Sequence, residues 1–311
     1  EGTARMGAEM QENRDSVLSY LVCSHCKGAL RQEAAQAICE ACGKSFRSNG
    51  NGQLDLRLRH PEKVSVEFEL GNAVTDDSFD FGVLSQKPDP EVDFSGANAP
   101  WHLTPELLSY FPRAADPSQV ALDLGCGSGL HRAVCERAGF RWLGVDYGNP
   151  QALALADAHS LPLSNSSVDF VLSMAVLEHL QYPFVTAREV LRVLKPGGYY
   201  IGTVSFLEPF HGDSYYHHTH FGTFNTLRSA GFEILRIAPT LEWSGLRAQA
   251  EMALFPRAPA FAQRFAVWPV ELLHKLWWKL GSLKGSRSSS QLTRVLRTTG
   301  SFQFVARKRA R

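Results

Sequence analysis

Four cysteines near the beginning of the sequence have the spacing of metal ligands. Cys23 and Cys26 form one C-x-x-C pair, Cys39 and Cys42 form a second, and twelve residues separate the two pairs. Two such pairs supply four thiolates, the ligand set of a structural zinc ion in tetrahedral coordination. Two redox-active dithiols are the alternative, but a doubled pair at this spacing favours zinc. We therefore predict a structural zinc site with no coordination position left for chemistry.

An apolar run followed by closely spaced glycines predicts a ligand-binding turn. Residues 120–124 have the character of a buried strand, and Gly125, Gly127 and Gly129 follow them. Glycines at the carboxyl end of a parallel strand let the backbone approach a ligand closely. The dinucleotide-binding fingerprint needs its third glycine three residues after the second, whereas here the interval is two. The turn therefore does not fit that fingerprint.

This segment resembles the first motif of the class I S-adenosylmethionine-dependent methyltransferases of the type 11 group. An acid stands two residues before the first glycine, and three further motifs follow in the order typical of the family. The resemblance implies that Asp146, at the end of a second strand, accepts the ribose hydroxyls, and that Asp157 begins the adenine-binding turn. It implies S-adenosylmethionine as the cofactor and the following binding residues: Asp123, Gly125, Cys126, Gly127, Asp146, Tyr147, Asp157, Ala158 and Met174.

Histidines are concentrated after the fifth predicted strand of this domain. His217, His218 and His220 stand directly before a predicted helix, and His218, His220 and Phe221 match the H-x-H-F pattern of many small-molecule members of the family. In the family this region lies over the methyl group of the cofactor. Histidine accepts a proton readily near neutral pH, so we predict that one of the three histidines is the catalytic base.

Other roles for these and neighbouring residues remain open. The histidines could instead cap the helix, or could hold a metal ion together with His211, although no matching cluster of acids is evident in the sequence. Glu178 and His179 belong to a widespread L-E-H element that is more often a structural turn at the pocket edge than a catalytic pair. Cys126 and Cys135 are predicted to be small core residues.

The elements that position these residues predict an α/β fold. Strands and helices alternate after residue 101, which indicates a parallel sheet covered by helices. The resemblance implies the Rossmann-like, seven-stranded sheet of the class I methyltransferases. We expect a zinc-ribbon module with an N-terminal tail over residues 1–58, a linker over 59–100 and a methyltransferase domain over 101–311. The module resembles small Trm112-like zinc ribbons. Only ten residues separate Asp146 from Asp157, so the helix that usually joins these strands is expected to be mostly missing.

A helical insertion is predicted over residues 240–300, before the last strand. Apolar and aromatic residues line one helical face, and residues 272–311 carry ten Lys and Arg but no Asp or Glu. One interpretation is a lid or a membrane-surface helix over residues 261–290 that meets anionic lipid. The other is a packing element that covers the core or forms a dimer. Strong amphipathicity is common to both.

The composition limits the classes of protein to consider. Lys and Arg number 32 against 31 Asp and Glu, and 44% of the residues are hydrophobic, which excludes disordered and collagen-like chains. Since the whole chain sums to +1, residues 1–271 carry −9, which argues against a long basic channel for nucleic acid. No apolar run approaches the roughly 18 residues that span a bilayer. Residues 1–14 lack the apolar core of a secretory signal, so a cytoplasmic protein, peripheral to the membrane if the insertion binds lipid, is expected.

These observations lead to one main hypothesis and two alternatives. We expect S-adenosylmethionine-dependent methyl transfer, at oxygen, to a small-molecule, glycan or lipid-linked acceptor. An RNA methyltransferase that grips rRNA or tRNA with its zinc ribbon is the first alternative. It is not favoured, because the body is acidic and the N-P-P-Y-type tetrapeptide of amino-group methylases is missing after the fourth strand. A non-catalytic, S-adenosylmethionine-binding scaffold is the second alternative.

Overall fold

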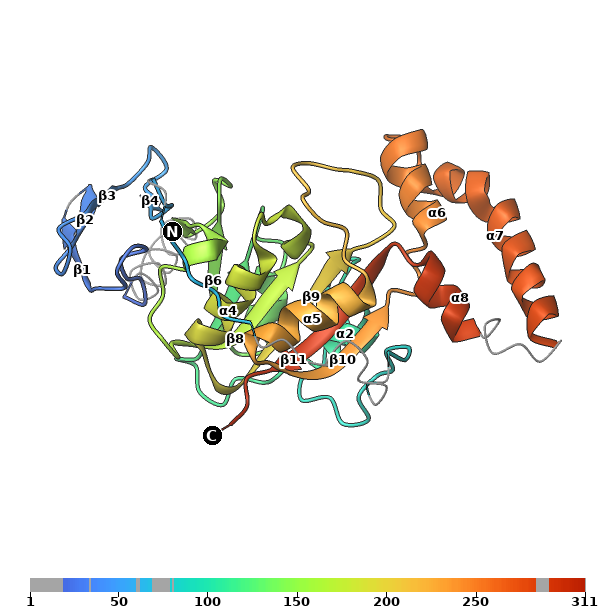
Figure 1. The fold of residues 1–311 in the computed structure, drawn as a ribbon, viewed down its shortest axis with the longest axis horizontal. Helices are drawn as coiled ribbons and strands as arrows, with labels where there is room; N and C mark the ends of the chain where they lie inside the picture. The colour runs from blue at the N-terminus through green and yellow to red at the C-terminus, as the bar shows by residue number, and fades with distance from the viewer. Residues whose placement is uncertain are drawn as a thin grey trace.

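The computed structural model describes residues 19–33, 35–59, 62–68, 79, 81–283 and 291–310. These residues form a central sheet with helices on both faces, a small cysteine-bearing sheet at one end and a helical insertion at the other (Figure 1). The fold prediction is thereby confirmed. The segment examined for a secretory signal, residues 1–14, and the end of the predicted lipid-binding stretch, residues 284–290, lie outside the described residues.

The central sheet has eight strands in the order β10-β11-β9-β8-β5-β6-β7-β4. Their bounds are β4 Leu54–Asp55, β5 Val120–Leu124, β6 Arg141–Asp146, β7 Ala154–Leu155, β8 Val168–Met174, β9 Leu194–Ser205, β10 Glu233–Pro239 and β11 Ser301–Arg307. Strand β11 is antiparallel to both of its neighbours, and the pairs from β9 to β4 are parallel. Every residue of β5 is buried, as expected for a strand covered on both faces.

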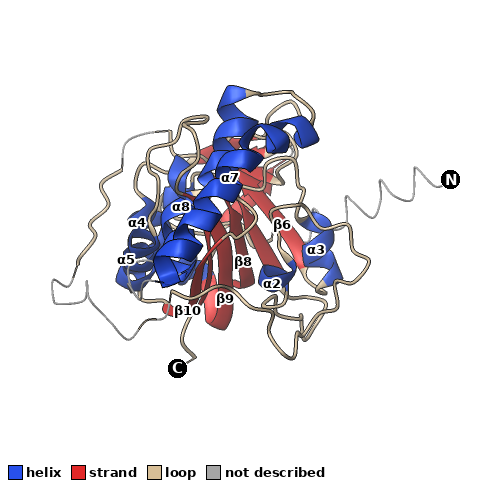
Figure 2. Cartoon of the chain, turned by 90° about the vertical axis from the view of Figure 1, so that its right-hand side faces the viewer, coloured by secondary structure: helices blue, strands red, loops and turns tan. Residues whose placement is uncertain are grey.

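Helices cover the two faces of the sheet. Figure 2 shows α4 (Pro183–Val193) and α5 (His220–Ala230) on one face, and α2 (Pro105–Leu108) and α3 (Arg132–Arg137) on the other. Helix α5 begins where Thr219 Oγ1 accepts a hydrogen bond from the Gly222 amide, and it ends at Gly231, whose φ of 103° favours glycine. As predicted, no helix joins β6 to β7: residues 147–153, all of them described, form turns and bends.

The N-terminal module forms a three-stranded sheet of β1 (Leu30–Glu33), β2 (Gln36–Cys39) and β3 (Ser45–Arg47). The chain then contributes β4, the eighth strand of the central sheet, which the sequence did not predict. Its pairing with β7 extends the sheet where the joining helix is missing. Gln53, which is buried, donates hydrogen bonds from Nε2 to the carbonyls of Asn149 and Ala152 and so supports this shortened connection.

The stretch between the module and α2 packs along the core through aromatic side chains. Phe79 lies against Phe224 of α5, with ring centroids 5.0 Å apart, and Phe94 lies against Phe111 at 5.5 Å. The described part of residues 59–100 has no regular secondary structure, so the side-chain contacts hold it against the core.

The insertion before β11 is helical, as predicted. It comprises α6 (Gly245–Ala248), a π-helical turn η4 (Gln249–Leu254), α7 (Ala260–Leu283) and α8 (Gln291–Thr298). Figure 1 shows α7 standing at the opposite end of the molecule from the cysteine module. Within the described part of the chain, no helix combines the length and apolar character needed to cross a bilayer.

Candidate functional site

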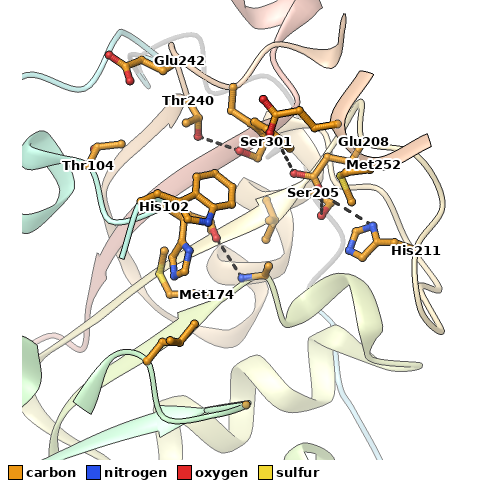
Figure 3. Close-up of a pocket in the computed structure, with 18 of the residues that line it drawn as sticks. His102, Thr104, Met174, Ser205, Glu208, His211, Thr240, Glu242, Met252 and Ser301 are labelled. Carbon is orange, nitrogen blue, oxygen red and sulfur yellow. Dashed lines mark hydrogen bonds and ion pairs between the residues drawn. The ribbon is translucent and has the colours of Figure 1, made fainter. Parts of the chain in front are cut away.

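A cavity of about 700 Å³ opens at the carboxyl ends of β5, β8 and β9, beneath the helical insertion (Figure 3). This is the edge at which open α/β sheets bind their ligands. The sheet side of its lining includes the glycine-rich turn Gly125–Ser128, Met174 and Ser205. The insertion side includes Trp243, Arg247, Met252 and Arg264.

The glycine-rich turn is shaped for close approach of a ligand. Gly125 and Gly127 have φ values of 67° and 49°, which favour glycine. A Cβ at Gly125 would lie 2.6 Å from Val176 Cγ2, while a Cβ at Gly127 would meet only open space. The Gly127 amide donates a 3.0 Å hydrogen bond to Asp146 Oδ2, so the turn and the end of β6 are held together.

The nine residues predicted to bind the cofactor fall into four groups. Four of them line the cavity: Gly125, Cys126, Gly127 and Met174. Asp146 lies beside the turn, where its Oδ1 also accepts hydrogen bonds from the Gly148 and Asn149 amides. Tyr147, Asp157 and Ala158 lie beyond the lining of the cavity, and Asp123 is completely buried.

Asp157 begins a short 3₁₀ turn, η2 (Ala158–Ser160), and serves as its cap. Its Oδ1 accepts hydrogen bonds from the amide of His159 at 2.9 Å and from the imidazole of His159 at 2.7 Å. Burial would raise the pKa of Asp157, but these hydrogen bonds lower it overall. The carboxylate is therefore held in its ionised form, which is the form that accepts a hydrogen bond from an amine.

Asp123 anchors a buried chain of polar groups that the sequence did not reveal. Its carboxylate accepts a 3.0 Å hydrogen bond from the Trp142 indole and lies 3.2 Å from His131 Nδ1. His131 Nε2 lies 2.6 Å from His102 Nε2, and both histidines line the cavity. If His131 donates to Asp123, it accepts from His102, which leaves His102 Nδ1 as the basic nitrogen. Burial and the neighbouring His131 lower the pKa of His102 to about 4.

The three histidines expected to supply the base do not line the cavity. His217 is exposed, and His218 is buried with its Nε2 unpartnered among the described residues. The His220 ring packs among aromatic rings, including Phe81 at 4.9 Å and Phe302 at 5.5 Å. Burial lowers the pKa of both His218 and His220. Their assignment as bases therefore stays a prediction, without support from their placement.

A different polar group lies on the wall of the cavity. Glu208 Oε1 accepts a 2.6 Å hydrogen bond from the Trp243 indole, and Glu208 Oε2 lies 2.5 Å from Ser205 Oγ and 4.0 Å from His211 Nδ1. Ser205 Oγ also contacts Glu178 Oε1 at 2.6 Å. Glu178 is completely buried, and this burial raises its pKa to about 7. Glu208 follows a strand with no recognisable motif, so only the fold brings it to the site.

The four cysteines meet at one point of the N-terminal module. Their sulfurs all lie within 4.8 Å of one another, with Cys23 and Cys42 at 3.7 Å and Cys26 and Cys39 at 3.4 Å. Tetrahedral coordination with zinc–sulfur bonds of about 2.3 Å places sulfurs about 3.8 Å apart. The cluster therefore fits a structural zinc ion, and its four thiolates would complete the coordination.

The first cysteine knuckle contacts the domain of the central sheet beside η2. Lys27 Nζ donates hydrogen bonds to Ser160 Oγ at 2.7 Å and to the Leu161 carbonyl at 3.1 Å, and it pairs with Glu189 at 3.3 Å. Ser160 Oγ in turn donates to the carbonyl of Ser24 at 2.5 Å. The cysteine-bearing turn thus shares a hydrogen-bond network with the turn that Asp157 begins.

Two solved structures are similar to this chain at low sequence identity. The phosphoethanolamine N-methyltransferase 2 of Haemonchus contortus is 16% identical, with 64% of this chain and 50% of that chain covered and a TM-score of 0.41. An S-adenosylmethionine-dependent methyltransferase of Mesorhizobium loti is 18% identical, with 69% and 100% covered and a TM-score of 0.41.

Sequence comparison assigns the family. Residues 122–202 match the family described as "Methyltransferase domain". An uncharacterized methyltransferase of Mycobacterium ulcerans is 34% identical, with 41% of this chain and 56% of the relative covered, and the chain spans 40% of a Mycobacterium leprae relative. The chain thus spans about half the length of these relatives. A further methyltransferase, from Mycobacterium avium, is 32% identical, with 48% of this chain and 69% of the relative covered. The chain belongs to the class I S-adenosylmethionine-dependent methyltransferases.

Proposed function

We propose that the protein transfers a methyl group from S-adenosylmethionine to a hydroxyl oxygen of a small-molecule, glycan or lipid-linked acceptor. The observation that carries this proposal is the cavity itself. One wall is the glycine-rich turn of the family's cofactor motif, and the other contains Glu208 and His211 beneath the helical insertion. A volume of about 700 Å³ suits a cofactor and part of an acceptor.

The cofactor is assigned to the edge of the sheet that carries the family motifs. Asp146 accepts hydrogen bonds from the ribose hydroxyls and Asp157 accepts one from the adenine amine, while Gly125 and Gly127 leave room for the methionine moiety. Met174 and Cys126 contribute apolar surface. The hydrogen-bonded residues Asp123, His131 and His102 hold the glycine-rich turn in place, and we assign them a structural role.

S-adenosylmethionine, when bound, supplies an electrophilic methyl group, and the hydroxyl that takes it must lose a proton. Glu208 is the group we assign to receive that proton, because its carboxylate lines the cavity and is fixed by Trp243 and Ser205. Rigid placement of such a group contributes to rate because the acceptor needs no reorganisation on reaching the methyl carbon. His217, His218 and His220 are secondary candidates.

The N-terminal cysteines are assigned to a structural zinc ion. A module of this size buries little apolar surface, so a metal would contribute much of its folding free energy. Its docking beside η2 gives zinc an indirect role in cofactor binding. No step of the reaction is assigned to this ion, because four thiolates fill its coordination sphere.

The face of α7 is assigned to an anionic membrane surface that presents a lipid-linked acceptor. Helix α7 packs against the rest of the insertion through Gln263, Val267 and Glu271, which are buried and recur every four residues. The opposite face leaves large apolar side chains in solvent: Phe261, Phe265, Trp268, Leu273, Leu276, Trp277 and Leu280. Lys275 and Lys279 stand on the same helix, and no acid occurs after Glu271, so the charge complements anionic lipid.

Calorimetry with S-adenosylmethionine tests the proposal. The wild type should bind one molecule of cofactor, and Asp146→Asn should weaken binding by about 10- to 100-fold, the effect of losing a charged hydrogen bond. The matched control is Asp116→Asn, an exposed acid far from the cavity that should leave binding unchanged. Absence of binding heat and of a thermal shift in the wild type would sink the proposal.

A radiolabelled-methyl screen then identifies the acceptor. Extract is fractionated into lipid, glycan, small-molecule and RNA pools, and each pool is incubated with the protein and labelled cofactor. Label in the first three pools, on a product that mass spectrometry identifies as a methyl ether, supports transfer to a hydroxyl. Label confined to RNA would instead establish the alternative of a zinc-ribbon RNA methyltransferase.

A further inference from the structure

Three potential metal ligands meet where β8 and β9 end, apart from the cysteine module. A carboxylate oxygen of Glu178 and one ring nitrogen each of His179 and His211 all lie within 4.8 Å of one another. Neither the cofactor assignment nor the proton transfer to Glu208 uses these three side chains. The close approach of two imidazoles and a buried carboxylate therefore needs its own explanation.

The backbone holds these ligands in place from two segments. Ala175, with a φ of 54°, turns the chain sharply after β8 into the 3₁₀ turn η3 (Leu177–His179), which carries two of the three ligands. The Glu178 carbonyl accepts hydrogen bonds from the amides of Tyr215 and Tyr216 at 2.7 and 3.1 Å. These bonds fasten the loop that carries His211 to η3, and the His179 and His211 rings meet edge to face at 5.1 Å.

Glu178 provides an independent sign that a positively charged ligand is needed. Its side chain is completely buried, and its Oε2 has no hydrogen-bond partner among the described residues. Within that same part of the chain, no Lys or Arg is ion-paired to it. An unpaired buried carboxylate oxygen is costly, and native structures satisfy nearly all such atoms.

The hydroxyl of Ser205 adds to the excess of acceptors. It lies within hydrogen-bond distance of Glu178 Oε1, at 2.6 Å, and of Glu208 Oε2, at 2.5 Å. A serine has a single proton to donate, so when Ser205 fixes Glu208 it leaves Glu178 Oε1 without a donor. The site thus brings together two carboxylates and two imidazoles, all of which can act as metal ligands.

We propose that Glu178, His179 and His211 bind a divalent cation at the wall of the cavity. Two imidazoles and one carboxylate suit zinc, manganese or ferrous iron better than calcium or magnesium, which prefer all-oxygen ligands. Three protein ligands leave coordination positions open. Because His211 and Glu208 line the cavity, the open positions face the acceptor.

The cation deepens the proposed methyl transfer, on which its role rests. Bound through an open position, the acceptor hydroxyl has its pKa lowered by the cation, as metal-bound water does. Its proton passes to the Glu208 carboxylate, and its oxygen forms the bond to the methyl carbon as the carbon–sulfur bond breaks with its electron pair left on sulfur. The cation changes no oxidation state, so no external oxidant or reductant is needed.

Manganese binding tests the site without reference to activity. The full chain is prepared with zinc in its cysteine module and titrated with Mn²⁺, and free Mn²⁺ is followed by electron paramagnetic resonance. Thiolate ligands prefer zinc, so the cysteine module should not take up manganese. The wild type should bind one Mn²⁺ per chain. No binding up to millimolar Mn²⁺ would overturn the proposal.

Single-ligand variants locate the ion. Glu178→Gln keeps the shape of the side chain, and His211→Asn changes a half-buried loop residue, so at least one should fold. Each folded variant should bind Mn²⁺ at least about tenfold more weakly. His217→Asn makes the same chemical change at an exposed histidine six residues away and should bind as the wild type does. Equal binding by wild type and His211→Asn would place the ion elsewhere and refute the site.

Calorimetry with S-adenosylmethionine on the same samples separates the two ideas. Cofactor binding without Mn²⁺ binding leaves the proposed methyl transfer standing and removes the metal site. Mn²⁺ binding without cofactor binding supports the metal site and refutes the proposed methyl transfer. The cation would then have a role other than methyl transfer.

Discussion

The Glu208 carboxylate is fixed by two hydrogen bonds and faces the cavity, whereas the neighbouring Glu178 carboxylate is wholly buried. The difference in exposure separates their roles. Glu208 can exchange protons with a bound acceptor, whereas Glu178 can only interact with groups inside the protein. An acid with donors on both oxygens is held in one rotamer, which is what a proton acceptor in methyl transfer needs.

Replacing Glu208 by glutamine should therefore slow the reaction selectively. We expect kcat for a hydroxyl acceptor to fall by about 10²- to 10⁴-fold, since the amide cannot take the proton, while the Kd of S-adenosylmethionine changes little. Single-turnover methyl transfer and calorimetry measure the two quantities. The same exchange at Glu242, which also lines the cavity, is the control. A kcat within threefold of wild type in Glu208→Gln would remove Glu208 from the mechanism.

His102 should make the fold sensitive to acid. Its pKa is about 4 in the folded protein and about 6.5 in an unfolded chain, so between these values the unfolded state binds the extra proton. The free energy of unfolding should therefore fall as the pH falls from 6.5 to 4, by about 1–2 kcal/mol after allowance for the partial exposure of the ring.

Urea unfolding at several pH values measures this effect. His102→Phe should flatten the dependence over that range, whereas His217→Phe, at an exposed position, should not. The titratable groups near His102 belong to one hydrogen-bonded series, in which His131 contacts His102 and Asp123 contacts His131. If His102→Phe retains the full acid sensitivity of the wild type, another group is responsible.

Among the elements, η2 is where the cysteine module contacts the edge of the sheet that we assign to the cofactor. Lys27, on the first knuckle, binds Ser160 and Leu161 in or beside η2, and η2 begins at Asp157. A local network of charge-assisted hydrogen bonds connects the two, so order in the knuckle favours order in the turn. We therefore expect the module to stabilise the turn that begins at Asp157.

Loss of this contact should weaken cofactor binding from a distance. Lys27→Met removes the hydrogen bonds and the pair with Glu189, and we expect the Kd for S-adenosylmethionine to rise by about three- to tenfold, with a stability loss of about 1–2 kcal/mol. Removal of the metal with a chelator should have a similar or larger effect on the Kd. Lys44→Met, on an exposed lysine of the same module, is the control. Unchanged affinity after both treatments would show that the module acts independently.

The sequence predicted those elements that their own residues specify. Strand β5 and the turn at Gly125 follow from an apolar run and a glycine pattern, and α5 from its cap and Gly231. Strand β4 was missed because it is only two residues long and becomes a strand only by pairing with β7. The convergence of Glu178, Ser205 and Glu208 was missed for the same reason, because no local pattern encodes contacts between β8, β9 and the loop that follows.

On the scale of the whole molecule, the uneven charge has a structural counterpart. The cysteine module lies at one end of the long axis and α7 at the other (Figure 1). The insertion that carries α7 also lines the cavity. Among the described basic residues after position 272, Lys275, Lys279, Arg294 and Arg297 lie on α7 and α8, whereas Arg307, Lys308 and Arg309 lie at the far end of β11 and after it. Contact with an anionic surface through α7 would bring the mouth of the cavity close to that surface.

Liposome sedimentation tests this orientation. The wild type should sediment with vesicles rich in anionic lipid and less with zwitterionic ones, and binding should weaken as salt increases. Replacing Phe261, Phe265 and Trp277 by serine should lower the bound fraction severalfold. Tyr182→Ser, at an exposed aromatic residue off the helix, should not. A concentration-dependent dimer that forms through α7, with no binding to either vesicle, would favour the packing interpretation instead.

Strand β11 has a consequence for how the protein acquires its structure. It lies between β9 and β10, although more than sixty residues of insertion and loop separate it from β10 along the chain. Until β11 arrives, β9 and β10 both present unpaired edges, and buried residues such as Phe302 and Phe304 are missing from the core. Non-local pairing of this kind folds slowly and leaves an intermediate prone to association. A ribosome-bound chain should therefore remain protease-sensitive in this half of the sheet until residue 307 has left the exit tunnel.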